Sequence, residues 1–205
     1  LDEAKANTIQ EAMADTKKKE IYLRFMDKSQ VAMAGHWDKA NNYVRGIEDY
    51  LLTEQYRRPE HQQKVVEDIL DNWIQYSQNN KFHGMFATSS IAEAIEYYRL
   101  FKKLKPKLKI TALFDPNIDN NENAKFKEDG LVEIISDYNN RYGMEFSLAT
   151  HAKMKRDIAD RLAHKELYKR VEHTPEKQLD LLIVVDQMLT GFDSKWVNTL
   201  YLDKM

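Results

Sequence analysis

Residues 179–185 read LDLLIVV and form the most hydrophobic run in the chain. A short, nearly continuous apolar run of this kind is typical of a strand buried on both faces. Such strands occur mainly in parallel sheets, where helices cover each side. We therefore expect residues 179–185 to form a central strand of a parallel sheet.

Three other short apolar runs predict further strands at 82–87, 108–114 and 197–202. Helical patterns separate them. An apolar stripe predicts a helix before the first of these strands, and it comprises Val65, Val66, Ile69, Leu70, Trp73 and Ile74. The helix after that strand buries a second stripe, made of Ile91, Ala94, Ile95, Tyr98 and Phe101. This alternation predicts an α/β domain with a parallel sheet flanked by helices and joined by right-handed crossovers.

Two more helices are expected before the central strand. The first carries Leu131, Ile134, Ile135 and Tyr138, follows a polar loop at 117–123 and ends near Gly143. The second runs from about Thr150 to Arg170 and places Met154, Ile158 and Leu162 on one face.

The first 58 residues differ in character from the rest. They are polar and charged, and one helical face would hold Tyr43, Val44, Ile47, Tyr50 and Leu51. We expect residues 1–58 to form N-terminal helices that lead into a domain at 59–205.

Composition indicates a soluble globular protein. The 205 residues are 42% hydrophobic and 31% charged, and no apolar run is long enough to span a membrane. The absence of cysteine excludes disulfides, thiolate zinc sites and a cysteine nucleophile, and fits a cytoplasmic protein. The net charge of -2 does not by itself indicate nucleic-acid binding. Because Leu1 is not an initiator methionine, we expect the chain to be an excised segment.

Side chains that could bind a ligand follow two of the predicted strands. Thr88, Ser89 and Ser90 follow the strand at 82–87 and could hold a phosphate with hydroxyls and helix amides. Capping is the simpler interpretation, because Ser90 and Glu93 have the spacing of a capping box.

The second strand end is the loop DQMLTGFD at 186–193, where Gly191 permits a sharp turn, Thr190 can donate to a phosphate and Asp193 can accept a hydrogen bond. An ordinary turn in which Asp193 caps the next element is the alternative.

A family resemblance covers about residues 59–205. The string LLIVVDQMLTGFD at 181–193, followed by NTLYLDK at 198–204, resembles motif V of the restriction (R) subunits of type I restriction–modification enzymes. The string FATSSIAEA at 86–94, with Tyr97 and Tyr98, resembles the family's segment at motif IV.

The resemblance implies a superfamily 2 helicase motor with two RecA-like domains, of which residues 59–205 would be the second, truncated before motif VI. The helix from about 150 to 170 would be an insertion between motor strands. Gly191 and Asp193 would approach the nucleotide cleft, whereas Thr190 and the loop Thr88, Ser89 and Ser90 would lie nearer the DNA backbone. ATP and magnesium would bind the full-length parent, and neither would bind this segment tightly.

The implied partners are DNA, the preceding RecA-like domain, a C-terminal segment of the parent, and the modification and specificity subunits, with no membrane. No catalytic or metal-ligating residue is predicted. The sequence contains no G-x-x-x-x-G-K-[ST] phosphate loop, so we expect the segment alone to hydrolyse no ATP.

Local charges and rings have mostly structural interpretations. The basic run contains Arg99, Lys102, Lys103, Lys105, Lys107 and Lys109 and fits a solvated helix end better than a DNA contact. We expect His83 to be structural, Trp73 to be a core residue, and Trp196 to pack across the adjoining strand or against another domain.

Two other functions remain as alternatives for the chain: a stand-alone α/β phosphate- or nucleotide-binding domain, and a degenerate helicase-fold interaction domain.

Overall fold

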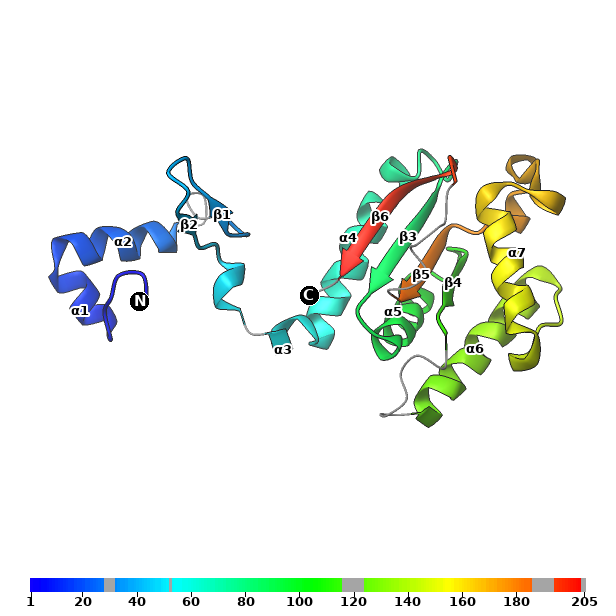
Figure 1. Ribbon diagram of the computed structural model, residues 1–205, viewed down its shortest axis with the longest axis horizontal. Coiled ribbons are helices and arrows are strands. Elements are labelled where there is room, and N and C mark those ends of the chain that lie inside the picture. The colour runs from blue at the N-terminus through cyan, green and yellow to red at the C-terminus, as the bar shows by residue number, and fades with distance from the viewer. Residues whose placement is uncertain (28–31, 52, 116–123, 186–193, 204–205) are drawn as a thin grey trace. The chain divides into compact units, whose positions relative to one another are not determined.

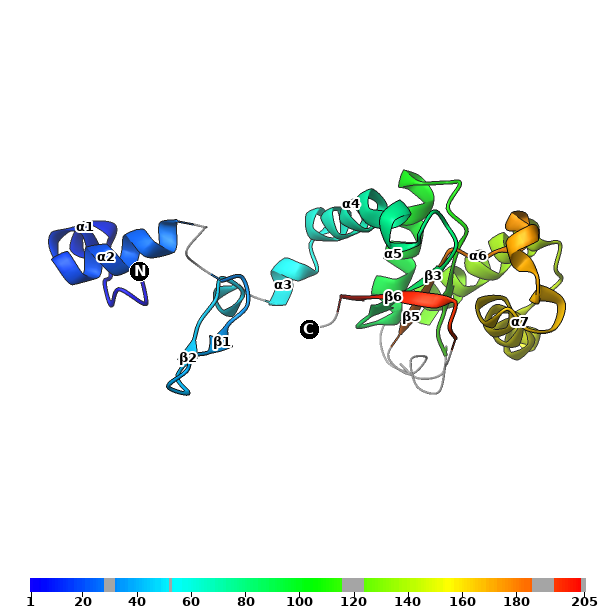
Figure 2. The ribbon, with the colours of Figure 1, turned by 90° about the horizontal axis from the view of Figure 1, so that it is seen from above.

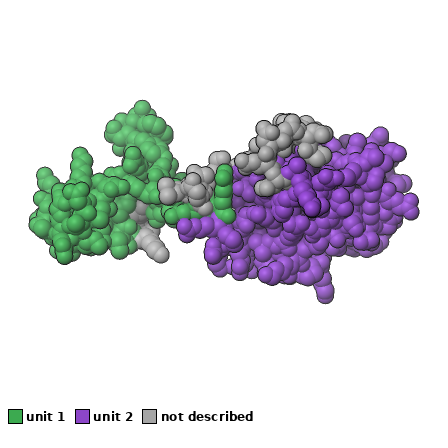
Figure 3. Space-filling view, turned by 90° about the horizontal axis from the view of Figure 1, so that it is seen from below, with its two compact units in different colours: residues 1–57 green, residues 58–205 purple. Residues whose placement is uncertain are grey.

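The computed structural model describes residues 1–27, 32–51, 53–115, 124–185 and 194–203. The chain forms two compact units, residues 1–57 and residues 58–205 (Figure 3). The polar loop expected at 117–123 lies outside the described residues.

The first unit contains two short helices, α1 (Ile9–Ala14) and α2 (Thr16–Met26), and they confirm the expected N-terminal helices. Side chains cap both, since Thr8 accepts from the Glu11 amide and Asp15 from the Lys18 amide. The core of this unit is small: Ala4, Ala6 and Ala12 are buried, and Ile21 and Tyr22 pack against them.

The prediction that residues 43–51 form one face of a helix is wrong. Strands β1 (His36–Trp37) and β2 (Tyr43–Val44) form an antiparallel hairpin, which is followed by the short helices η1 (Glu48–Tyr50) and α3 (Thr53–Tyr56). Asp38 Oδ1 accepts from the amides of Ala40 and Asn42 at 2.8 Å each, and Asn41 is left-handed with φ 61°. This Asx turn reverses the chain, so Tyr43 packs across the hairpin against Trp37.

The second unit contains a four-stranded sheet with the order β4-β5-β3-β6 (Figure 1). Its strands are β3 (His83–Thr88), β4 (Ile110–Leu113), β5 (Leu181–Val185) and β6 (Val197–Asp203), and all pairs are parallel. The predicted parallel sheet and the central position of β5 are therefore confirmed.

Helices α4 (Pro59–Tyr76) and α5 (Ile91–Leu104) lie on one side of the sheet (Figure 2). Phe86 of β3 packs edge-on against Tyr97 and Phe101 of α5, and the Trp73 ring of α4 reaches Gly84. Trp73 is buried, as predicted, because α4 turns its apolar stripe toward the sheet.

Helices α6 (Ala124–Tyr142) and α7 (His151–Ala163) connect β4 to β5, with η2 (Leu148–Thr150) between them. The helix expected to reach Arg170 ends at Ala163, because His164 adopts a left-handed conformation with φ 51° and ψ 49°. Three single 3₁₀ turns follow: η3 (Glu166–Tyr168), η4 (Val171–His173) and η5 (Pro175–Lys177). No helix among the described residues has the length and apolarity needed to cross a membrane.

Candidate functional site at the carboxyl edge of the sheet

The candidate site lies where β3 and β6 end side by side. Thr88 is the register partner of Asp203, so residues far apart in the sequence meet at this edge. Ligands of open parallel sheets bind at the carboxyl ends of strands, which makes this edge the place to examine.

The loop from Thr88 to Ser90 is tied to its surroundings. Thr88 is buried, and its hydroxyl lies 3.2 Å from the Ser90 carbonyl oxygen and 3.4 Å from that of Val184. Ser90 Oγ accepts from the Glu93 amide at 3.2 Å, which confirms that Ser90 caps α5. The Glu93 carboxylate in turn accepts from the Ser89 amide at 3.1 Å, one residue before this N-cap.

Ser89 is the exposed member of this loop. Its hydroxyl donates to the backbone carbonyl of Asp203 at 3.3 Å. A surface hydroxyl on a single long hydrogen bond can exchange that acceptor for a phosphate oxygen with little loss.

Asp203 connects three elements at this edge. Its Oδ2 accepts a short hydrogen bond from the Tyr97 hydroxyl of α5, and its Oδ1 lies 3.6 Å from His61 Nε2 of α4. Burial, and then the hydrogen bond to Asp203, raise the pKa of Tyr97, so the phenol remains a donor at neutral pH.

Tyr97 and Asp203 fall within the two motif resemblances, but the sequence alone predicts no role for either residue. Their contact depends on the register between β3 and β6, and the only sequence signal is that Asp203 closes a strand.

The other predicted site residues, Thr190, Gly191 and Asp193, lie outside the described residues. In the described part of the chain, no group of three or more histidine or carboxylate side chains could hold a metal ion. Asp203 alone, already bound to Tyr97, does not complete a site for magnesium and a nucleotide.

The basic run is partly neutralised by neighbouring acids. Arg99 and Lys102 of α5 form ion pairs with Glu133 of α6 at 2.8 and 3.3 Å, and Lys109 pairs with Asp180 at 3.2 Å. These contacts join α5 to α6 and the start of β4 to the start of β5, which supports a structural role for half of the run.

Comparison with known proteins identifies the family. A model of the family described as "Type I restriction enzyme subunit R domain 3" matches residues 80–205, which is more than half of the chain. The chain belongs to this family. The matched region includes all four strands of the parallel sheet and the whole carboxyl edge.

Curated relatives agree with this assignment. The chain is 35% identical over 148 residues to the type I restriction enzyme SauCOLORF180P endonuclease subunit of Staphylococcus aureus (strain COL), and equally to the SauMSSORF170P endonuclease subunit of strain MSSA476. It is 31% identical over 149 residues to the SsaAORF53P endonuclease subunit of Staphylococcus saprophyticus. Each match covers 68% of this chain and 15% of the relative, so the chain spans a small part of these subunits.

Proposed function

We propose that this chain is the second RecA-like domain of an R subunit and works in an ATP-dependent motor that translocates DNA for a type I restriction endonuclease. The observation that carries the proposal is the family match over 80–205, because it coincides with the parallel sheet and its carboxyl edge. In this proposal the domain supplies half of an inter-domain ATP cleft and part of the DNA track.

The nucleotide half of the proposal rests on Gly191 and Asp193. The stretch of sequence that contains them follows β5, which lies beside β3 in the sheet. Gly191 would let the backbone approach the nucleotide, and Asp193 would accept a hydrogen bond from a ribose hydroxyl, a metal-bound water or a basic partner. ATP with magnesium would supply the phosphoryl-transfer chemistry that powers movement.

The DNA half of the proposal rests on Thr190 and on the loop from Thr88 to Ser90. Ser89 offers an exposed hydroxyl beside the N-terminus of α5, where the helix dipole favours an anion. Asp203 would act on this loop as a positioning residue, because its carbonyl holds Ser89 and its carboxylate holds Tyr97.

The decisive experiment is Asp193→Ala in the full-length R subunit that contains this chain. We expect the DNA-stimulated ATPase to fall about tenfold or more, in line with the loss of one group that stabilises a phosphoryl-transfer site. The matched control is Asp129→Ala, which removes an exposed carboxylate from α6. An unchanged rate in Asp193→Ala would remove the nucleotide-cleft assignment and favour a degenerate interaction domain.

The isolated chain provides a second test. Without a phosphate loop it lacks the groups that neutralise the transferred phosphoryl charge, so we expect no DNA-stimulated ATPase from it. Metal-dependent ATP turnover by the purified 205-residue chain would instead favour a stand-alone phosphate-binding enzyme.

The partners proposed for the parent subunit are DNA, its own first motor domain and C-terminal segment, and the modification and specificity subunits. Its proposed location is the cytoplasm. Co-purification of the full-length subunit with modification and specificity subunits tests the assembly separately from the motor chemistry.

A further inference from the structure

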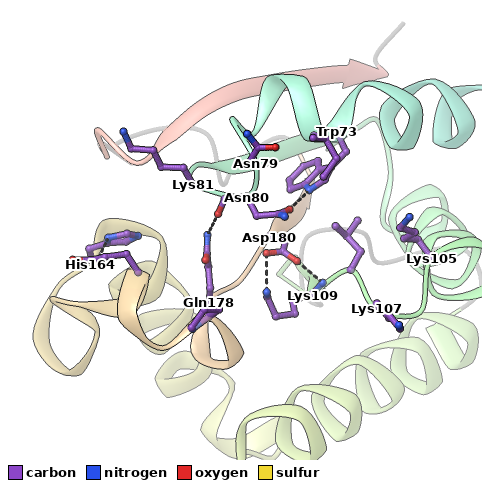
Figure 4. Close-up of a pocket in the computed structure, with 14 residues that line it drawn as sticks. Trp73, Asn79, Asn80, Lys81, Lys105, Lys107, Lys109, His164, Gln178 and Asp180 are labelled. Carbon is purple, nitrogen blue, oxygen red and sulfur yellow. Dashed lines mark hydrogen bonds and ion pairs between the residues drawn. The ribbon is translucent and has the colours of Figure 1, made fainter.

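A pocket of about 540 Å³ lies at the amino edge of the sheet, opposite the candidate functional site. Residues that come just before three strands line it: Lys109 and Asp180 directly precede β4 and β5, and Lys81 lies two residues before β3 (Figure 4). We call this cavity the amino-edge pocket. Its volume is in the range of small-molecule sites.

The lining of the amino-edge pocket is positively charged. It contains four lysines and two carboxylates, which leaves a formal charge of two positive when His164 is neutral, in a chain whose net charge is -2. Lys109 forms an ion pair with Asp180. Lys105 and Lys107 are exposed, and neither has a carboxylate within 4.0 Å among the described residues. Free cations beside a concave surface attract phosphate groups.

Two buried acceptors face the same pocket. His83 Nδ1 donates to the Leu179 carbonyl, so its Nε2 must accept from His164 Nε2, which lies 2.9 Å away. This tautomer leaves a lone pair on His164 Nδ1, which has no hydrogen-bond partner among the described residues although the side chain is 3% exposed. The Glu172 carboxylate, 3.7 Å away, is also an acceptor.

Asp180 is the second such acceptor. Its Oδ2 accepts from the Lys109 amide at 2.9 Å, and its Oδ1 is paired with the Lys109 ammonium at 3.2 Å, which leaves one of the two lone pairs of Oδ1 for a further donor. Buried polar atoms are nearly always satisfied, so the pocket fits a ligand that brings hydroxyl or amino donors.

The walls of the pocket are held in place. Trp73 Nε1 donates to Asn80 Oδ1 at 2.7 Å, and Gln178 Nε2 donates to the Asn80 carbonyl at 2.7 Å (Figure 4). Trp196 stacks on the His164 ring with centroids 4.1 Å apart, which fixes that ring as well. A pocket with hydrogen-bonded walls needs little rearrangement to accept a ligand.

We propose that the amino-edge pocket binds a small phosphorylated sugar, either free or as part of a nucleotide. The phosphate lies against Lys105 and Lys107, and sugar hydroxyls donate to His164 Nδ1 and Asp180 Oδ1. This site is independent of the proposed ATP cleft, because it uses the opposite ends of the strands.

The test is calorimetric titration of the complete 205-residue chain with ribose 5-phosphate, inorganic phosphate and ribose. We expect saturable one-to-one binding of ribose 5-phosphate, at least about tenfold tighter than that of inorganic phosphate. Lys105→Gln/Lys107→Gln should weaken it about tenfold or more. The matched control, Lys153→Gln/Lys155→Gln on the exposed face of α7, should leave it unchanged.

His164→Asn tests the acceptor, since asparagine tolerates the left-handed conformation. We expect it to reduce the preference for ribose 5-phosphate over inorganic phosphate, while phosphate binding itself persists. If this variant does not fold, the comparison of the two lysine double variants still tests whether the pocket binds ribose 5-phosphate. The proposal is overturned if ribose 5-phosphate gives no saturable heat, or if the two double variants weaken its binding equally.

Discussion

At the residue scale, Tyr97 and Asp203 form the contact that ties the candidate site together. The phenol is fully buried, donates to Asp203 and also packs its ring against Phe86 at 4.8 Å. Hydrophobic packing and hydrogen bonding by this one side chain can therefore be separated by removing the hydroxyl alone.

Tyr97→Phe keeps the ring and removes the donor. We expect the free energy of unfolding to fall by about 1–3 kcal/mol, because the Asp203 carboxylate loses a hydrogen bond at a partly buried position. Urea denaturation of the 205-residue chain measures this. Tyr76→Phe, at an exposed tyrosine, is the control, and equal stability of the two variants would contradict a structural role for the contact.

A second residue-scale feature is the cation inside the helical insertion. Arg161 is 1% exposed and lies 3.8 Å from the Tyr142 ring and 4.3 Å from the Tyr168 ring. Its guanidinium donates to Asp157 at 2.9 Å and to the Lys177 carbonyl at 2.6 Å. One side chain thus joins α6, α7 and the 3₁₀ turns through both charge and stacking.

Arg161→Leu leaves Asp157 without its buried cation. We expect a loss of about 3–5 kcal/mol in the free energy of unfolding, the usual effect of breaking a buried ion pair. Arg156→Leu on the exposed side of the same helix is the control and should change stability little. A change of less than about 1 kcal/mol in Arg161→Leu would mean that the aromatic rings alone hold the insertion together.

At the element scale, the start of β3 and the end of α7 are joined by the histidine pair His83 and His164. Burial lowers the pKa of His83 to about 4, despite the hydrogen bond to Leu179, and burial also lowers the pKa of His164. The Lys109 charge further lowers the pKa of His83. At His164, the Lys195 charge also lowers the pKa, whereas the Glu172 carboxylate raises it.

This pair predicts a pH dependence of folding. The pKa of His83 is lower in the folded chain than the unfolded value of about 6.5, so the unfolded chain takes up a proton first as the pH falls. The contribution of neutral His83 to folding stability is therefore complete above pH 6.5 and is lost as the pH falls toward 4. Between about pH 7 and pH 5 we expect the free energy of unfolding to fall by about 2 kcal/mol from His83 alone. Asp180, whose pKa is raised by burial, acts in the opposite direction.

Urea denaturation at the two pH values measures this loss. His83→Asn should show a shallower pH dependence than the unmodified chain, whereas His173→Asn, at an exposed histidine, should retain the full dependence. Equal slopes for the two variants would assign the effect to other groups.

The elements also show what could be predicted from the sequence. Strands β3 and β5 and helices α4 and α5 follow long, regular apolar patterns, and each lies within a few residues of its expected position. The hairpin at 36–44 and the end of α7 at Ala163 were missed, because each depends on one left-handed residue, Asn41 or His164. The N-cap at Ser90 was predicted because it is local, but the Tyr97–Asp203 contact was not because it needs the strand register.

At the scale of the whole molecule, the two units differ greatly in the core that each buries. The main hydrophobic cluster consists of residues from Val66 to Val184 and includes no described residue of the first 57. Among its described residues, the first unit has a buried cluster of three alanines, while larger apolar side chains such as Trp37 and Met26 are about two-thirds exposed. So small a buried apolar area gives little stability to a unit of this length.

This asymmetry predicts that the second unit is stable without the first. A chain of residues 58–205 should keep its melting temperature within about 3 °C of that of the full 205 residues, because no residue of its core has been removed. Residues 77–205 form the control, since that truncation also deletes α4 with Val66, Ile69 and Trp73 and should abolish cooperative unfolding. If the 58–205 chain melts more than about 5 °C lower, residues 1–57 contribute to the stability of the sheet domain, and the two units must be treated as one cooperative structure.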